Sequence, residues 1–413
     1  MMAEKAKKPA IRFSGFTDAW EQRELGMVGS FYYGHSCPKW SVTEDATTPC
    51  IRYGELYTKF GTIVDRVFSY TSMPSEKLRF SKGTEVLIPR VGEDPMDYNH
   101  CTWLSLKGIA IGEMISVFNS DQNPLFMAIM FNATLQQEFA MRVEGGSVTN
   151  LYFEKLKNIE VKYPLISEQQ KIGQFFQSID RLITLHQRKY DKLTKIKKSM
   201  LEKMFPKNGS NVPEIRFSGF SDAWEQRKLE DVFQKIRNAF VGTATPFYVK
   251  DGHFYLESNN VKDGEINRNS EVFINDEFYE KQRDNWLHSG DIVMVQSGHV
   301  GHSAVIPDSL NDTAAHALII IANPKQKICP HFVNVQFMSP KAKKNIGNIT
   351  TGNTIKHILA SDMKVFEILL PSHMEQTRIG QFFKSLDRLI TLHQRELDRL
   401  QKIKKSCLEK MFV

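Results

Sequence analysis

The chain has little cysteine and no long apolar run, and both absences restrict its class. Its five cysteines, Cys37, Cys50, Cys101, Cys329 and Cys407, are odd in number, widely spaced and include no CxxC pair. Neither a disulfide framework nor a zinc site is therefore indicated. No apolar run is long enough to span a bilayer, and no apolar stretch follows the N-terminal lysines. We expect a reduced, cytoplasmic protein.

Sequence motifs of common enzymes are also missing. The chain has no GxxxxGK[ST] loop, no GxGxxG after a strand, no HExxH and no GxSxG. The segment Asn123-Pro124-Leu125-Phe126 resembles the NPPF tetrapeptide of amino-methyltransferases but lacks the second proline. We favour a turn that starts a helix over a catalytic role for this segment.

Histidines form one further pattern that could bind a metal. His299 and His302 make an HxxH, with His288 and His316 nearby in sequence. They lie in a glycine-containing turn without cysteine support, and a metal needs three or four convergent ligands. We therefore expect no metal, and interpret the turn as a loop that presents polar side chains to a partner.

One helical stretch occurs twice and organises the chain. Residues 168–205 and 375–412 match at all but nine of 38 positions, with apolar residues at heptad spacing. At 1.5 Å per residue, each helix would be roughly 57 Å long, which suits a spacer. The expected helix-helix seam comprises Ile172, Ile179, His186, Leu193 and Met200 in the first copy, and Ile379, Leu386, His393, Leu400 and Cys407 in the second.

The heptad pattern also contains two histidines and a second apolar row. His186 and His393 fall on the seam, where we favour a role in fixing register over a ligand role. A neighbouring row is predicted at Phe175, Leu182 and Ile196, and at Phe382, Leu389 and Ile403.

A second repeat opens each half of the chain. IRFSGFTDAWEQR at residues 11–23 returns as IRFSGFSDAWEQR at residues 215–227, and the variable middles differ in net length by three residues. We predict a domain over 1–166, a helix over 167–205, a linker over 206–214, a second domain over 215–373 and a helix over 374–413. This is an α+β chain with two tandem, pseudo-symmetric mixed α/β domains.

Both middles show strands followed by a helix, a glycine loop and a final strand. In the first we predict strands at 62–70, 85–89, 115–118 and 159–163, and a helix at 125–143. In the second we predict strands at 254–257, 291–296, 303–307, 318–322 and 365–370, and a helix from 331 to about 345. The glycine loops lie at 145–150 and 350–354.

The formal net charge of +7 favours an acidic partner. DNA contact needs basic groups for phosphates and polar groups for base edges, and loops are where we expect them. The candidates in the first half are Arg52, Lys59, Lys82, Arg90, Tyr98, Asn99, Ser147, Thr149 and Asn150. Those in the second half are Asn259, Asn260, Gln296, Ser297, His299, Thr350, Thr351, Asn353 and Lys356.

Two diverged middles between near-identical helices resemble the specificity subunit of type I restriction-modification systems. Two segments resemble sequence motifs that recur in that family, GDIVMVQSG at residues 290–298 and EQTRIGQFF at residues 375–383. The first half departs from the first of these motifs and has KGTEVLIPRVG at residues 82–92. The resemblance implies that each middle is a target recognition domain for one half of a bipartite DNA site. It also implies that the helices pack as an antiparallel coiled coil and act as a ruler.

The resemblance implies partners and no catalysis in this chain. Two modification subunits would bind S-adenosylmethionine and methylate adenine, and two restriction subunits would use ATP and Mg to move and cut double-stranded DNA. This chain would bind no cofactor itself. The competing hypotheses are a diverged adenine methyltransferase that uses residues 123–126, and a coiled-coil scaffold without DNA contact.

Overall fold

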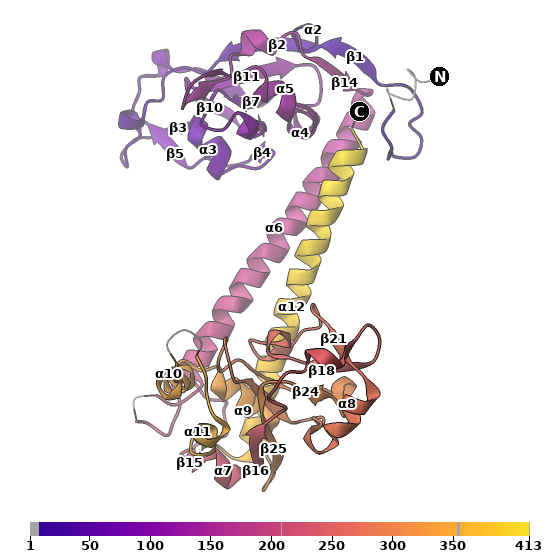
Figure 1. Ribbon diagram of the computed structural model, residues 1–413. Coiled ribbons are helices and arrows are strands. Elements are labelled where there is room, and N and C mark those ends of the chain that lie inside the picture. The colour runs from indigo at the N-terminus through magenta and orange to yellow at the C-terminus, as the bar shows by residue number, and fades with distance from the viewer. Residues whose placement is uncertain (1–7, 208, 353–355, 413) are drawn as a thin grey trace. The chain divides into compact units, whose positions relative to one another are not determined.

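The computed structural model describes residues 8–207, 209–352 and 356–412, which fold into two compact units. Unit 1 runs to His186 and includes the segment from Glu396 onward, whereas unit 2 spans Gln187–Arg395. Each unit therefore holds one domain together with part of each long helix (Figure 1). Over the described residues, no helix combines the length and the apolarity that crossing a bilayer requires.

Unit 1 is built on two mixed sheets, one of which packs against helix α4 (Pro124–Thr134). The first sheet has the order β2 (Gly29–Tyr33), β11 (Ile115–Ser120), β7 (Glu85–Pro89), β9 (Thr102–Leu104), β4 (Ile63–Val64). The second has the order β5 (Ser69–Thr71), β3 (Thr48–Ile51), β10 (Lys107–Ile111), β6 (Phe80–Lys82). Every residue of β7 is buried: Val86 and Ile88 pack with helix α4 (Pro124–Thr134), and Leu87 packs in a separate apolar cluster with Ile51. Alternate side chains of one strand thus serve two cores.

Unit 2 repeats this plan. Its main sheet has the order β16 (Phe233–Asn238), β25 (Leu318–Pro324), β22 (Ile292–Val295), β23 (Ser303–Val305). A smaller sheet has the order β17 (Tyr248–Val249), β21 (Val272–Ile274), β18 (His253–Leu256), β24 (Ala314–Ala315). Ile292 and Met294 of β22 pack with α9 (Pro330–Phe337), whereas Val293 and Val295 belong to a second cluster. The central strands β7 and β22 therefore occupy equivalent places.

Shorter elements complete the two units. Unit 1 adds β1 (Glu21–Glu24), α2 (Leu25–Val28), α3 (Tyr53–Thr58), β8 (Val91–Gly92), α5 (Gln136–Ala140), β12 (Glu144–Gly145), β13 (Thr149–Asn150) and β14 (Glu160–Tyr163). Unit 2 adds β15 (Glu225–Lys228), α7 (Leu229–Val232), β19 (Val261–Lys262), β20 (Glu265–Ile266), α8 (Asp276–Lys281), α10 (Pro340–Ile349), α11 (Ala360–Lys364) and β26 (Glu367–Leu370). Strand β1 pairs antiparallel with β14 as β15 pairs with β26.

The long helices α6 (Ile166–Lys203) and α12 (His373–Lys410) pack antiparallel within each unit (Figure 1). In unit 1, Cys407 and Leu408 pack near Ile172 and Phe176, and in unit 2, Leu193 and Met200 pack near Ile379 and Leu386. One ion pair occurs in both units. Lys404 Nζ lies 2.5 Å from Asp180 Oδ1, and Lys197 Nζ lies 2.5 Å from Asp387 Oδ1.

The repeated opening motif docks on the base of a long helix in each unit. Arg12 makes a bidentate ion pair with Glu168, as Arg216 does with Glu375, and all four N–O distances are 2.7 Å. Because Glu168 and Glu375 are almost completely buried, each carboxylate depends on its arginine for charge compensation. Trp20 and Trp224 pack edge-on against phenylalanines of the same two cores. The sequence identity of the two motifs thus follows from a contact that both units use.

The observed elements correct several predictions. The expected strand at 62–70 is two short strands, β4 and β5, and the helix at 125–143 breaks at Leu135 into α4 and α5. The helix from 331 likewise ends at Phe337, because Ser339 caps a new helix, α10, through its contact with the Ala342 N–H. The final strand of the second half starts at Glu367, two residues later than predicted.

The predicted second row of the helix pair is also wrong in part. Leu182, Leu389 and Ile403 are exposed, by 43%, 42% and 37%. A helix that packs on one neighbouring helix buries one narrow stripe. The exposed leucines are available to something other than the partner helix.

Candidate nucleic-acid interface

In unit 1, six of the predicted DNA-contacting residues lie on or near the small sheet β12-β13-β8. Thr149 and Asn150 form β13, which pairs with Val91 and Gly92 of β8 directly after Arg90. Tyr98 donates to the Thr149 carbonyl at 2.6 Å, and Asn99 donates to the Asn132 carbonyl at 3.4 Å. The glycine loop is therefore held against the domain at its base.

Two members of this group are structural. Tyr98 is 1% exposed, and burial raises the pKa of its hydroxyl. Thr149 is also buried, and its hydroxyl contacts the Gly92 carbonyl at 3.1 Å. The prediction that these two side chains contact DNA is wrong in this structure, because neither reaches the surface. Both position the loop that carries the exposed Ser147.

Arg90 lies between two tyrosine rings. Its guanidinium carbon is 4.6 Å from the Tyr33 ring centroid and 5.3 Å from the Tyr152 centroid, and it donates to the Glu113 carbonyl at 3.3 Å. Such cation–π contacts hold the planar guanidinium in one orientation.

The remaining basic candidates of unit 1 lie on other elements. Arg52 precedes α3 and Lys59 follows it, with Lys59 Nζ 5.8 Å from the Phe68 ring centroid. Tyr57 of α3 donates to the Val91 carbonyl at 3.0 Å, so α3 contacts β8 of the loop cluster. Lys82 is exposed on β6, where its backbone N–H donates to Glu85 at 2.7 Å. The structure thus connects α3 to the loop cluster and leaves Lys82 on a different sheet.

In unit 2, two loops of the predicted set meet. Ser297 Oγ is 2.6 Å from His357 Nδ1, and the Gly298 N–H donates to the Lys356 carbonyl at 3.1 Å. Backbone hydrogen bonds also join Thr351 to His357 in both directions. Exposed His299 and Lys356 therefore lie on adjoining loop segments, His299 within residues 296–302 and Lys356 beside His357, which pairs with Thr351. Asn353 lies outside the described residues.

Three other candidates of unit 2 are partly committed to the fold. Asn260 is 1% exposed and donates to the carbonyls of Asn267 and Ser270, so its predicted DNA contact is wrong. Thr350 donates to the Ile346 carbonyl at 2.7 Å and ends α10. Gln296 accepts the Ile358 N–H through its backbone carbonyl, while its buried side-chain Oε1 has no hydrogen-bond partner among the residues that the structure describes. Asn259 is exposed.

The sequence interpretation missed two residues at this site. His357 joins the two loops, and Asp263 donates its backbone N–H to His302 Nδ1 at 3.2 Å. Burial lowers the pKa of His302, which favours its neutral form. The sequence did contain a signal for His357, because it follows Lys356 directly and the two polar residues end a glycine loop. The second depends on a contact between positions 39 residues apart, which spacing does not reveal.

The two alternative chemistries find no support in the geometry. Asn123 caps α4 by accepting the Phe126 N–H at 2.9 Å, and Phe126 is completely buried, so this ring cannot stack on a flipped base. The segment is the helix-starting turn that we favoured. No group of three or more histidine, cysteine or acidic side chains suited to a metal is found among the described residues. His288 instead contacts Asp312 at 2.9 Å.

Comparison with known proteins places both halves in one family. The family model described as type I restriction modification DNA specificity domain matches residues 111–195 and 221–402. The MjaVIII specificity subunit of Methanocaldococcus jannaschii, a type I restriction enzyme subunit, is 22% identical over 74% of each chain. A putative MjaX specificity subunit of the same organism is 25% identical over 62% of this chain and 58% of its own length.

A solved structure shares the fold of the whole chain. The type I restriction-modification S subunit from M. genitalium aligns with a TM-score of 0.59 over 98% of this chain and 99% of its own, at 12% identity. The family model covers more than half of the chain, with one match in each half. The chain therefore belongs to the type I restriction modification DNA specificity family, and it carries two specificity domains.

Proposed function

We propose that each domain reads one half of a bipartite DNA target through the loops described above. The observation that carries this proposal is the junction of two polar loops in unit 2, where Ser297 contacts His357 at 2.6 Å beside exposed His299 and Lys356. Polar side chains on loops held by a rigid scaffold suit the reading of base edges. In unit 1, Ser147 and Asn150 on the glycine loop take the same role.

The basic candidates have a different task in this proposal. Arg52, Lys59, Lys82 and Arg90 in the first half, and Lys356 in the second, meet phosphates and set the orientation of the duplex. Asn99, Asn259, Gln296, Thr350 and Thr351 complete the polar surface in this proposal. Asn353 belongs to the same loop in sequence.

Two modification subunits and two restriction subunits act with this chain in the proposed complex, on double-stranded DNA in the cytoplasm. S-adenosylmethionine, ATP and Mg belong to those partners. The helices support a paired partner, because the nine residues from Asp180 to Arg188 recur unchanged from Asp387 to Arg395. In both copies the leucines are exposed to similar degrees, by 43% and 45% at Leu182 and Leu185, and by 42% and 51% at Leu389 and Leu392. Two identical apolar surfaces fit two copies of one subunit.

The antiparallel helices serve as a coiled-coil ruler in this proposal. A helix of 38 residues extends roughly 57 Å, enough to hold two modules at half-sites about 35 Å apart. Deleting four residues near Tyr190, with a matching deletion near Leu397, should shorten the preferred spacer by about two base pairs, because one helical turn is about 5.4 Å. An unchanged spacer with altered half-sites would contradict the ruler.

The first test of the recognition role is single-molecule methylation mapping of genomic DNA. Cells that carry this chain with its modification subunit should show a bipartite motif with modified adenine in both halves, absent from cells that lack the chain. If no motif appears despite an active modification subunit, the recognition role fails in this form.

A further inference from the structure

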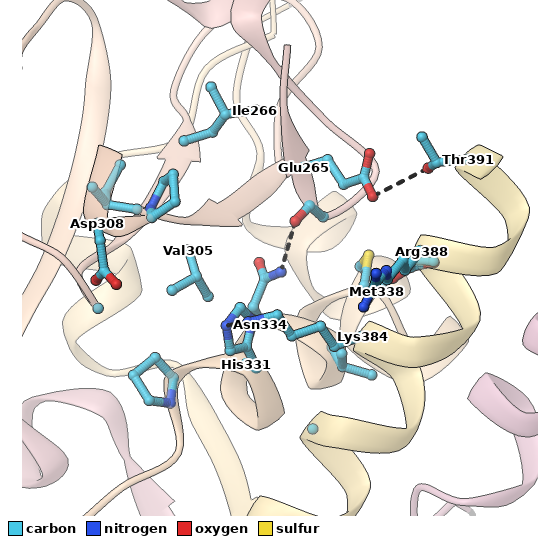
Figure 2. A pocket seen from close by; sticks show the side chains of 18 of the residues that line it. Glu265, Ile266, Val305, Asp308, His331, Asn334, Met338, Lys384, Arg388 and Thr391 are labelled. Carbon is cyan, nitrogen blue, oxygen red and sulfur yellow. Dashed lines mark hydrogen bonds between the residues drawn. The ribbon is translucent and has the colours of Figure 1, made fainter. Parts of the chain in front are cut away.

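A groove of about 790 Å³ separates the second domain from α12 in unit 2 (Figure 2). Its domain side includes Val305, Met338 and His331 together with the acidic Glu265 and Asp308, and its helix side includes Lys384, Arg388 and Arg395. The three cations follow one another at intervals of four and seven residues, so they share one face of α12 over roughly 16 Å. All three are exposed. The helix side of this groove is thus a row of positive charge.

These cations lack acidic partners. Among the described residues, no ion pair involves Lys384, Arg388 or Arg395, whereas Asp387 beside them is already paired with Lys197 at 2.5 Å. Lys384 Nζ lies 3.4 Å from His331 Nε2. Burial, with the Lys384 charge, lowers the pKa of His331, which favours the neutral form of the histidine. Glu265 and Asp308 also line the groove, but neither forms an ion pair with the three cations within the described ranges, so the row can bind an external anion.

A tight hairpin connects this groove to the proposed reading loops. Strands β19 and β20 turn at Asp263 and Gly264, whose φ angles of +50° and +97° suit a type I′ turn. On one side, the Asp263 N–H donates to His302 of the loop at 296–302. On the other side, Asn334 Nδ2 in the groove donates to the Gly264 carbonyl at 3.4 Å, and Thr391 of α12 donates to Glu265 at 3.5 Å (Figure 2). A ligand that leaves the loops toward α12 passes this hairpin and reaches the cations.

The repeat indicates what kind of ligand this is. Arg388 and Arg395 recur as Arg181 and Arg188 of α6, which are also exposed and form no ion pair within the described parts of the chain. The domains have diverged, as expected for parts that read different bases, but the helices have kept these arginines. A ligand that meets the two unchanged arginines beside diverged reading loops should look the same whatever the sequence read. Lys384, whose counterpart in α6 is Gln177, adds a cation in the second half alone. The sugar-phosphate backbone of DNA has that property.

We propose that Lys384, Arg388 and Arg395 bind backbone phosphates of the DNA spacer, next to the half-site read by the second domain. The inference rests on the proposed recognition function and extends it: α12 contacts the duplex as well as setting a distance. Because phosphate contacts carry no base information, this row contributes affinity and orientation without changing the sequence read.

The test uses the chain in complex with its modification subunits, and duplexes that carry the mapped target. Lys384→Gln/Arg388→Gln should reduce the slope of log Kd against log salt by about 2, since each phosphate contact contributes about 0.9. The affinity loss should be largest at low salt and shrink as salt rises. The recognised sequence should stay the same. The matched control is Lys189→Gln/Lys198→Gln, which removes equal charge from exposed positions of α6 outside the groove and should leave the slope unchanged.

A second measurement locates the contact. Neutral methylphosphonates that replace phosphates in the spacer beside the second half-site should weaken DNA binding by the wild-type complex. They should have little further effect on DNA binding by the double variant. Lys384→Arg should restore the slope in a single-position test against Lys384→Gln. An unchanged slope in the double variant, with target binding by the unmodified complex intact, overturns the inference. So does a double variant that loses its modification subunits, because the row would then dock a protein. A wild-type complex that shows no target preference instead rejects the proposed function.

Discussion

The two halves of the chain agree at the bases of their long helices and differ where each domain faces its helix. Arg12 and Arg216 make the same bidentate pair with a buried glutamate, and the Asp180–Lys404 pair repeats as Asp387–Lys197. The first contact holds the opening motif of each half to a long helix, and the second joins α6 to α12.

At the helix face, by contrast, the halves diverge. Gly380 of α12 lies against Cys329 and the start of α9, whereas the equivalent Gly173 of α6 lies against the side chains of Leu125 and Asn123. Further along each domain helix, Asn334 of the second half stands where the first has Ala128. The first half also brings Thr62 to 3.4 Å from Asp180. The Arg–Glu and Asp–Lys pairs thus form a shared frame that both halves keep, whereas the residues between each domain and its helix differ.

The largest expected effect comes from breaking the shared frame. Glu168→Ala or Glu375→Ala leaves a mostly buried arginine without its partner, and we expect a loss of about 3–5 kcal/mol in the free energy of unfolding for either variant. Denaturant unfolding measures the loss, and hydrogen exchange assigns it to a unit. Glu21→Ala, which removes an exposed pair with Arg23, is the control and should change stability by less than about 1 kcal/mol. Unequal losses for Glu168→Ala and Glu375→Ala would contradict the equivalence of the halves.

A smaller effect should separate the two reading surfaces. His357→Ala removes the junction with Ser297 and should cost about 1–3 kcal/mol of base discrimination in one half-site. Ser147→Ala should change the other half-site alone. Competition binding with single-base variants of the mapped target measures both. Equal losses at the two half-sites in either variant would show that the domains do not read independently.

The smallest expected effect concerns acid. Burial lowers the folded-state pKa of His302, with a further contribution from Lys343, His299 and Lys262, while Asp263 opposes the shift. The contribution of His302 to stability is therefore complete above the unfolded pKa of about 6.5 and is lost as pH falls toward the folded value. His302→Gln should make the melting temperature fall less between pH 7.5 and 5.5. An identical fall in both proteins would remove His302 from the acid response.

Local signals in the sequence predicted local structure. The heptad pattern predicts two long helices, and Asn123 before Pro124 predicts the start of α4, because a cap bonds to a backbone N–H three residues away. Tyr98 and Asn260 were misjudged for the opposite reason. The partner of Tyr98, Thr149, lies 51 positions along the chain, and Asn260 satisfies carbonyls inside its own folded loop. The sequence therefore does not distinguish a polar loop residue that points into solvent from one that is buried and supports the loop.

The duplicated Arg–Glu ion pair affects how a chain of this kind can evolve. Arg12 and Arg216 lie in nearly identical sequence, and so do Glu168 and Glu375. A gene rearrangement that replaces everything between one arginine and its glutamate would therefore keep both residues of the ion pair. New target preferences could then arise by transplanting an entire domain in one step, without a period in which the chain is too unstable to be inherited.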